Sequence, residues 1–106
     1  MREIYEALKT LAERNERGAL ITVTSTRGST PRKAGAKMVI LPGGEIVGTI
    51  GGGCVEAEIW QEAKEVMKTG EPKLLTYSLT ADLAGDSGMI CGGVMDMFIE
   101  PVGRTS

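Results

Sequence analysis

The sequence contains no histidine, only two cysteines and few aromatic residues, and each shortage excludes a class of protein. Aromatic residues make up 4% of the 106 residues, so the core must consist mainly of aliphatic side chains and methionine. Without histidine the chain lacks the commonest general base of enzymes. The two cysteines, Cys54 and Cys91, are not spaced like the ligands of a zinc site. Any catalysis would therefore depend on thiols and carboxylates.

The sequence also lacks an excess of basic residues and any long apolar run. Its formal net charge is -2, which argues against nucleic acid as the main partner, because phosphate backbones are held largely by lysine and arginine. No apolar run approaches the length of a membrane span, and no signal peptide is visible after Met1. We therefore expect a cytoplasmic protein, not bound to membrane, with reduced cysteines.

Apolar periodicity predicts two amphipathic helices, the second ending at Gly70, and about five strands. The helices are expected at residues 2–16 and 55–69. The strands are expected at residues 19–26, 38–41, 45–50, 73–79 and 94–102, with a hairpin turn at 42–44. This order predicts one small domain over residues 1–106, of the α/β class with α+β as the alternative. We expect a mixed sheet of about five strands with two helices.

The run Gly51-Gly52-Gly53-Cys54 lies where a predicted strand gives way to a predicted helix. A helix start exposes unpaired N–H groups and carries partial positive charge. Glycines without a Cβ let an anion, typically a phosphate, approach those groups. The same position would lower the pKa of the Cys54 thiol. The alternative is structural: the glycines permit a tight turn, and Cys54 is a small buried hydrophobic residue.

A second cysteine beside glycines, Cys91-Gly92-Gly93, follows a long glycine-rich loop over residues 80–93. Loops of that length in compact domains are often functional. A purely structural explanation must therefore account both for the glycines beside Cys54 and for those beside Cys91. The methionines Met89, Met95 and Met97 surround Cys91 and suggest soft-metal ligands for copper(I). The alternation of Met95 and Met97 along a strand favours core packing instead.

A third motif, Arg27 to Arg32 (RGSTPR), places two hydroxyl side chains between two arginines. The planar guanidinium group presents a fork of donors that suits phosphate. Ser29 and Thr30 can add hydrogen bonds to the same ligand. The alternative is an ordinary solvent-exposed loop.

The stretches TVTSTRGSTPRKAGAKMVI, GGEIVGTIGGGCVEAEI and MICGGVMDMFIEP together resemble the N-terminal domain of the XdhC/CoxI family. Members are accessory proteins of molybdenum hydroxylases such as xanthine dehydrogenase and carbon monoxide dehydrogenase. The resemblance runs from the first helix to Pro101. It implies a non-catalytic chaperone that binds the molybdenum cofactor (molybdopterin) and protects it while a terminal sulfur ligand is installed. A cysteine desulfurase would supply the sulfur, and an apo molybdenum hydroxylase would receive the cofactor.

The resemblance, with the arginine-bracketed loop, also predicts a cofactor-binding site without catalytic or metal-ligating residues. Its members are Arg27, Ser29, Thr30, Arg32, Gly51, Gly52, Gly53, Cys54, Glu56, Cys91, Gly92 and Gly93. The phosphate and soft sulfur of the cofactor agree with the anion-binding and thiol chemistry expected from these residues. Many family members continue into a second, Rossmann-like domain, which we expect to be absent here because the sequence is either a natural single-domain member or a fragment.

The sequence is also compatible with two other functions. One is a thiol-dependent sulfur carrier or small redox enzyme that uses Cys54 and Cys91. The other is a protein-interaction domain whose glycines are structural. A homodimer is a further candidate assembly, because a shallow site on a small domain gains walls from a second copy.

Overall fold

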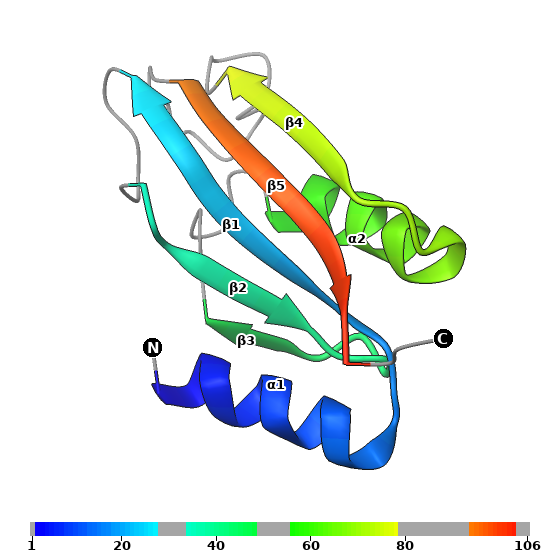
Figure 1. Ribbon diagram of the computed structural model, residues 1–106. Coiled ribbons are helices and arrows are strands. Elements are labelled where there is room, and N and C mark those ends of the chain that lie inside the picture. Colours follow the sequence, from blue (N-terminus) through cyan, green and yellow to red (C-terminus); the bar gives the residue numbers. More distant parts are fainter. Residues whose placement is uncertain (1, 28–33, 49–55, 79–93, 104–106) are drawn as a thin grey trace.

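The computed structural model describes residues 2–27, 34–48, 56–78 and 94–103 (Figure 1). The helices are α1 (Arg2–Arg14) and α2 (Glu56–Thr69). The strands are β1 (Gly18–Arg27), β2 (Lys37–Ile40), β3 (Ile46–Gly48), β4 (Lys73–Ser78) and β5 (Val94–Val102). The predicted pair of helices and the predicted set of strands are confirmed. The glycine-rich loop expected at residues 80–93 lies outside the described residues.

The sheet has the strand order β3-β2-β1-β5-β4, and every pairing between its described strands is antiparallel. The expected mixed sheet is therefore wrong, and the fold is α+β, the alternative class, rather than α/β. The reason lies in α2, which joins β3 to β4. These strands run in the same direction, as strands joined by a helix often do, but they occupy opposite edges of the sheet and do not pair.

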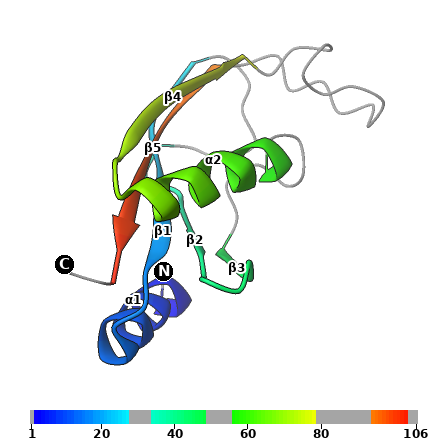
Figure 2. The same ribbon diagram turned by 90° about the vertical axis from the view of Figure 1, so that its right-hand side faces the viewer.

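The two helices pack on opposite faces of the sheet, because successive side chains of a strand point to opposite faces. Ile21 and Val23 of β1 face α2, whereas Leu20 faces α1. The core under α2 comprises Ala19, Ile21, Val23, Met38, Ile40, Ile59, Ala63, Val66, Met95, Met97 and Ile99. The smaller core under α1 comprises Ile4, Leu11, Leu20 and Val39. Figure 2 shows the helices well apart, with α2 alongside β4 and β5 and α1 near the start of β1.

Met95 and Met97 are fully buried on the face of β5 that α2 covers. The prediction that they pack the core is therefore confirmed, and they are not surface ligands for copper. Met89 lies outside the described residues.

The end of α2 is fixed by Gly70, as predicted. Gly70 adopts a positive φ of 77°, and its N–H donates to the carbonyl oxygen of Val66 at 2.8 Å. This is the usual glycine termination of a helix. The guanidinium group of Arg17 also donates to the carbonyl oxygen of Met67, at 3.3 Å. Within the described residues, neither helix has the length and apolarity that a membrane span requires.

Candidate functional site

Three strands of the sheet end, and two begin, on the same side of the molecule. Because neighbouring strands alternate in direction, β1, β3 and β4 point one way and β2 and β5 the other. Figure 1 shows the tips of β1 and β4 next to the start of β5. We call this side the motif end and define it by Arg27, Gly48, Glu56, Ser78 and Val94. The opposite side, with the turn at residues 41–45 and the end of α2, we call the turn end.

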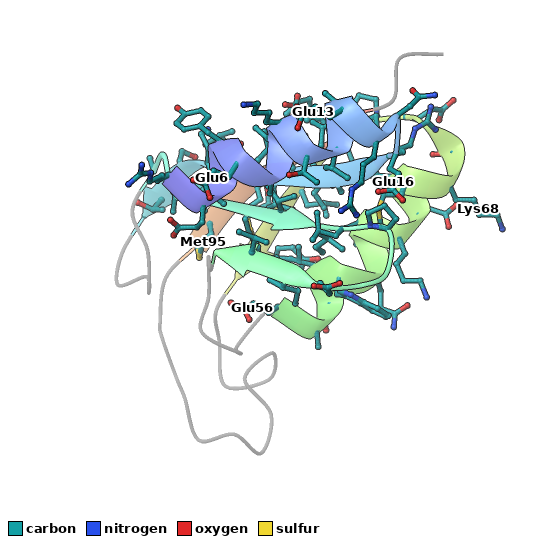
Figure 3. All side chains as sticks on the ribbon, turned by 90° about the horizontal axis from the view of Figure 1, so that it is seen from below. Glu6, Glu13, Glu16, Glu56, Lys68 and Met95 are labelled. Carbon is teal, nitrogen blue, oxygen red and sulfur yellow. The ribbon has the colours of Figure 1, made fainter. Side chains whose placement is uncertain are left out.

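The start of α2 belongs to the motif end. In Figure 3, Glu56 at the start of α2 and Met95 near the start of β5 lie toward one side of the molecule, whereas Glu16 and Lys68 lie toward the other. All three sequence motifs are joined to the described residues at the motif end. Segment 28–33 follows Arg27, segment 49–55 connects Gly48 to Glu56, and segment 79–93 connects Ser78 to Val94. The fold therefore brings the attachment points of all three motifs to one side.

Two of the predicted site residues, Arg27 and Glu56, are described. Arg27 is the last residue of β1, and Glu56 is the first residue of α2, where a carboxylate interacts favourably with the positive end of the helix dipole. The others lie outside the described residues, and their roles stay predictions. They are Ser29, Thr30, Arg32, Gly51, Gly52, Gly53, Cys54, Cys91, Gly92 and Gly93.

A polar cluster at the motif end centres on Asp96 of β5. The Ser25 hydroxyl donates to Oδ2 of Asp96 at 2.5 Å, and the Thr76 hydroxyl donates to Oδ1 at 2.6 Å. A terminal guanidinium nitrogen of Arg27 lies 3.6 Å from Oδ2. The cluster therefore joins the three neighbouring strands β1, β5 and β4 on the sheet face opposite α2. On that face Leu74 is 69% exposed, so α1 does not cover this part of the sheet.

These contacts keep Asp96 ionised and position Arg27. The hydrogen bonds from Ser25 and Thr76, with a smaller effect of the Arg27 charge, lower the pKa of Asp96 against the opposing effect of burial. The side chain of Arg27 is 66% exposed and that of Asp96 24%. The carboxylate thus anchors an accessible guanidinium group at the base of segment 28–33.

Sequence reasoning missed the Asp96 cluster. The available signal was the alternation of β5, which places a charged residue between two core methionines and therefore on the opposite face. The register that sets Ser25 and Thr76 beside Asp96 is a property of strand pairing, and periodicity does not contain it.

The Asp96→Asn variant is expected to show a pH-dependent loss of stability. Because the folded-state pKa of Asp96 is lowered, its contribution is present above the pKa of an unfolded aspartate. The contribution is lost as the pH falls through the folded-state pKa. Urea denaturation of both proteins across the acidic range should show a difference near neutral pH that vanishes in acid.

The Ser25→Ala variant serves as the control for this experiment. It removes the hydrogen bond that most lowers the pKa of Asp96, so the acid transition should move to higher pH. A stability difference between wild type and Asp96→Asn that stays constant at every pH would contradict the proposed role of the carboxylate.

Tyr77, next to the end of β4, lies on the other face of the sheet against the core under α2. Burial, reinforced by the carboxylates of Glu62 and Glu58, raises the pKa of Tyr77 to about 12. The phenol therefore stays protonated at neutral pH. Among the described residues, no group of three or more histidine, cysteine, aspartate or glutamate side chains is placed to hold a metal ion.

Comparison with known proteins identifies relatives of this chain. The sequence model of the XdhC and CoxI family matches residues 11–78. The chain is 36% identical over 96 residues to the uncharacterized protein YqeB of Escherichia coli. It is 30% identical over 104 residues to a probable xanthine dehydrogenase subunit of Bacillus subtilis. It is also 40% identical over 58 residues to the molybdenum cofactor insertion chaperone PaoD of Escherichia coli.

The same fold is present in a crystal structure of a xanthine dehydrogenase from Bacillus halodurans. The superposition has a TM-score of 0.79 and 33% sequence identity, and it covers 91% of this chain and 29% of that chain. The alignments cover 91% of this chain with YqeB, 96% with the Bacillus subtilis protein and 55% with PaoD. The chain spans 18%, 32% and 18% of the lengths of these three relatives, respectively.

Proposed function

Because the chain belongs to the XdhC and CoxI family, we propose that it binds the molybdenum cofactor at the motif end and delivers it to an apo molybdenum hydroxylase. The chain would act as a carrier, with the cofactor as its cargo and no turnover of its own. The identity of 40% with the insertion chaperone PaoD supports this role. The proposal concerns this domain alone, since it spans less than a third of the length of the first relative.

The observation that carries the proposal is the common attachment of the three motifs. Segments 28–33, 49–55 and 79–93 are far apart in the sequence, yet the antiparallel order of the sheet joins each of them to the motif end. Residues that bind one ligand must lie within reach of one another. A topology that placed these segments at different ends of the sheet would have excluded a shared site.

The residue types suit a ligand that combines a phosphate with soft sulfur. Arg27 is exposed at the motif end, anchored by Asp96, and its guanidinium group matches the geometry of phosphate oxygens. We propose that Arg32, Ser29 and Thr30 add donors to the same phosphate. Backbone N–H groups of Gly51, Gly52 and Gly53 ahead of α2 would bind it further. When bound, the cofactor supplies the molybdenum and sulfur chemistry that the hydroxylase later uses.

We propose that Cys54 and Cys91 face the soft part of the cofactor and shield it from water and oxidants. Glu56, in the first turn of α2, would contact the uncharged part of the ligand, because its carboxylate repels phosphate. The partners of such a carrier are a cysteine desulfurase as the sulfur source and the apo hydroxylase as the acceptor. A second copy of the chain would supply additional walls to the site.

The test is reconstitution of the purified chain with molybdopterin-form molybdenum cofactor, followed by gel filtration and metal analysis. We expect molybdenum to co-elute with the protein. The Arg27→Ala variant should retain about fivefold less molybdenum, as expected for the loss of one exposed charge contact to the ligand.

The matched control is Arg14→Ala. Arg14 is an exposed arginine in the last turn of α1, and it lies beside Leu41 and Pro42 at the turn end. Its replacement should leave retention unchanged. Molybdenum that elutes free of the wild-type chain, or equal losses in the two arginine variants, would refute the proposed site.

A further inference from the structure

A cavity of about 480 Å³ lies at the turn end, away from the three motifs. It is formed by Arg17 between α1 and β1, by the turn between β2 and β3, and by α2 from Trp60 to Lys68. Its lining residues are Arg17, Pro42, Gly43, Gly44, Trp60, Lys64, Met67 and Lys68. The volume falls within the usual range of small-molecule sites, about 300–1,000 Å³.

The lining of this turn-end cavity is strongly basic. It contains Arg17, Lys64 and Lys68, and none of the described acidic side chains lines it. The chain as a whole has a formal net charge of -2, so this concentration of positive charge is opposite in sign to the rest of the molecule. Arg17 also donates to the Met67 carbonyl at the end of α2, where the helix dipole is negative. Lys64 and Lys68 are the cations best placed to attract an anionic ligand.

Trp60 gives the cavity a rigid aromatic wall. Its indole N–H donates to the carbonyl oxygen of Gly44 at 3.2 Å, and the Lys64 ammonium group lies 4.5 Å from the ring centroid. Gly44 has a positive φ of 94°, and a Cβ there would approach the indole to 3.4 Å. The turn at Gly44 therefore packs closely against the indole ring of Trp60. A flat aromatic surface beside cations suits a ligand with both a planar ring and negative charge.

We propose that the turn-end cavity binds a small phosphorylated ligand with a planar heterocycle, the chemistry of a mononucleotide. The heterocycle would contact Trp60 and the apolar Met67, and the phosphate would bind Lys64 and Lys68. This site is separate from the motif end and goes beyond the proposed cofactor delivery. Sequence analysis missed it because Arg17, Gly44 and Trp60 come from three distant segments.

The sole tryptophan of the chain makes this proposal directly testable. Adenosine 5′-monophosphate is titrated into the wild-type protein while Trp60 fluorescence is recorded, and binding is confirmed by calorimetry. We expect a saturable change and competition by inorganic phosphate. The double variant Lys64→Gln/Lys68→Gln should bind roughly tenfold more weakly, because it loses two charge-assisted contacts to the phosphate. Uncharged adenosine should likewise bind more weakly.

The control is Lys9→Gln, which removes one exposed lysine of α1 outside the cavity and should bind like wild type. A linear, non-saturable fluorescence change would overturn the proposal. Equal affinity of the double variant, or equal affinity for adenosine and its monophosphate, would overturn it as well. Molybdenum retention by the double variant separates the two sites, since it should equal that of wild type whether or not the nucleotide binds.

Discussion

The Gly48→Ala variant is expected to lose about 3 kcal/mol or more of its free energy of unfolding, a large fraction of the roughly 5–15 kcal/mol that is typical of such domains. Gly48 ends β3 with a positive φ of 86°. A Cβ at this position would lie 2.8 Å from the carbonyl oxygen of Lys37 and 2.9 Å from Cδ1 of Ile4. The Lys37 carbonyl belongs to β2, which is paired on both sides and cannot easily move. The variant therefore combines backbone strain with overpacking.

The Gly35→Ala variant isolates the first of these two effects. Gly35 has a similar φ of 96°, but a Cβ there would meet no atom of the described residues within 4 Å. Only the backbone strain remains, at about 1 kcal/mol. Urea denaturation of both variants should show the larger loss for Gly48→Ala. Equal losses would mean that β3 and α1 are packed less closely than the structure has them.

The Gly48→Ala substitution is expected to affect cofactor binding as well as stability. Gly48 is the last described residue before segment 49–55, which carries the three glycines and Cys54. If β3 is held as the structure indicates, that segment begins at a fixed point at the motif end. A Gly48→Ala variant that still folds should therefore retain less molybdenum, because the start of the segment is displaced.

The Cys54→Ala variant is expected to retain at least about tenfold less molybdenum than wild type after gel filtration. The thiol is proposed to be partly ionised at a helix start, where it provides the soft, polarisable contact that the cofactor sulfur and molybdenum prefer. A charge-assisted contact of this kind corresponds to about 1.5 kcal/mol or more, which is a factor of ten or more in affinity. Metal analysis of the protein peak measures the effect.

The Cys54→Ser variant is the control for shape. Serine keeps the size and a hydrogen-bonding group but removes the sulfur, so it should lose as much molybdenum as alanine does. If both variants retain molybdenum like wild type, the proposed thiol contact is wrong. A persulfide on Cys54 or Cys91, detected by mass spectrometry in the same proteins, would then favour the sulfur-carrier alternative.

The sequence predicted those parts of the fold that depend on local periodicity. The apolar residues of α2 at helical spacing, such as Ile59 and Ala63, are buried as expected. The alternation of β5 correctly placed Met95 and Met97 in the core. Gly70 ended α2 because a positive φ at the helix end is favourable for glycine. In each case the decisive interaction lies within the element or between one face of it and the core.

The sequence did not predict features that depend on which elements become neighbours. The pairing of β1 with β5 joins the start of the chain to its end, and it made the sheet antiparallel rather than mixed. The same pairing placed Ser25 beside Asp96 and so created the anchor for Arg27. The turn-end cavity likewise forms only because the fold brings Arg17 and Trp60, which are distant in the sequence, to the same place. Motif resemblance supplied the family, but only the topology showed that the described residues flanking the three motifs lie at one end of the sheet.

The most direct test of the shared site is chemical cross-linking of the chain's two cysteines. A short bifunctional thiol reagent is applied to the native protein, and the product is identified by mass spectrometry. We expect Cys54 and Cys91 to be bridged within one chain, and prior loading with the cofactor should protect them. If the native chain gives only separate single modifications, as the urea-unfolded chain should, the two cysteine motifs do not share a site and the proposed cofactor site is wrong.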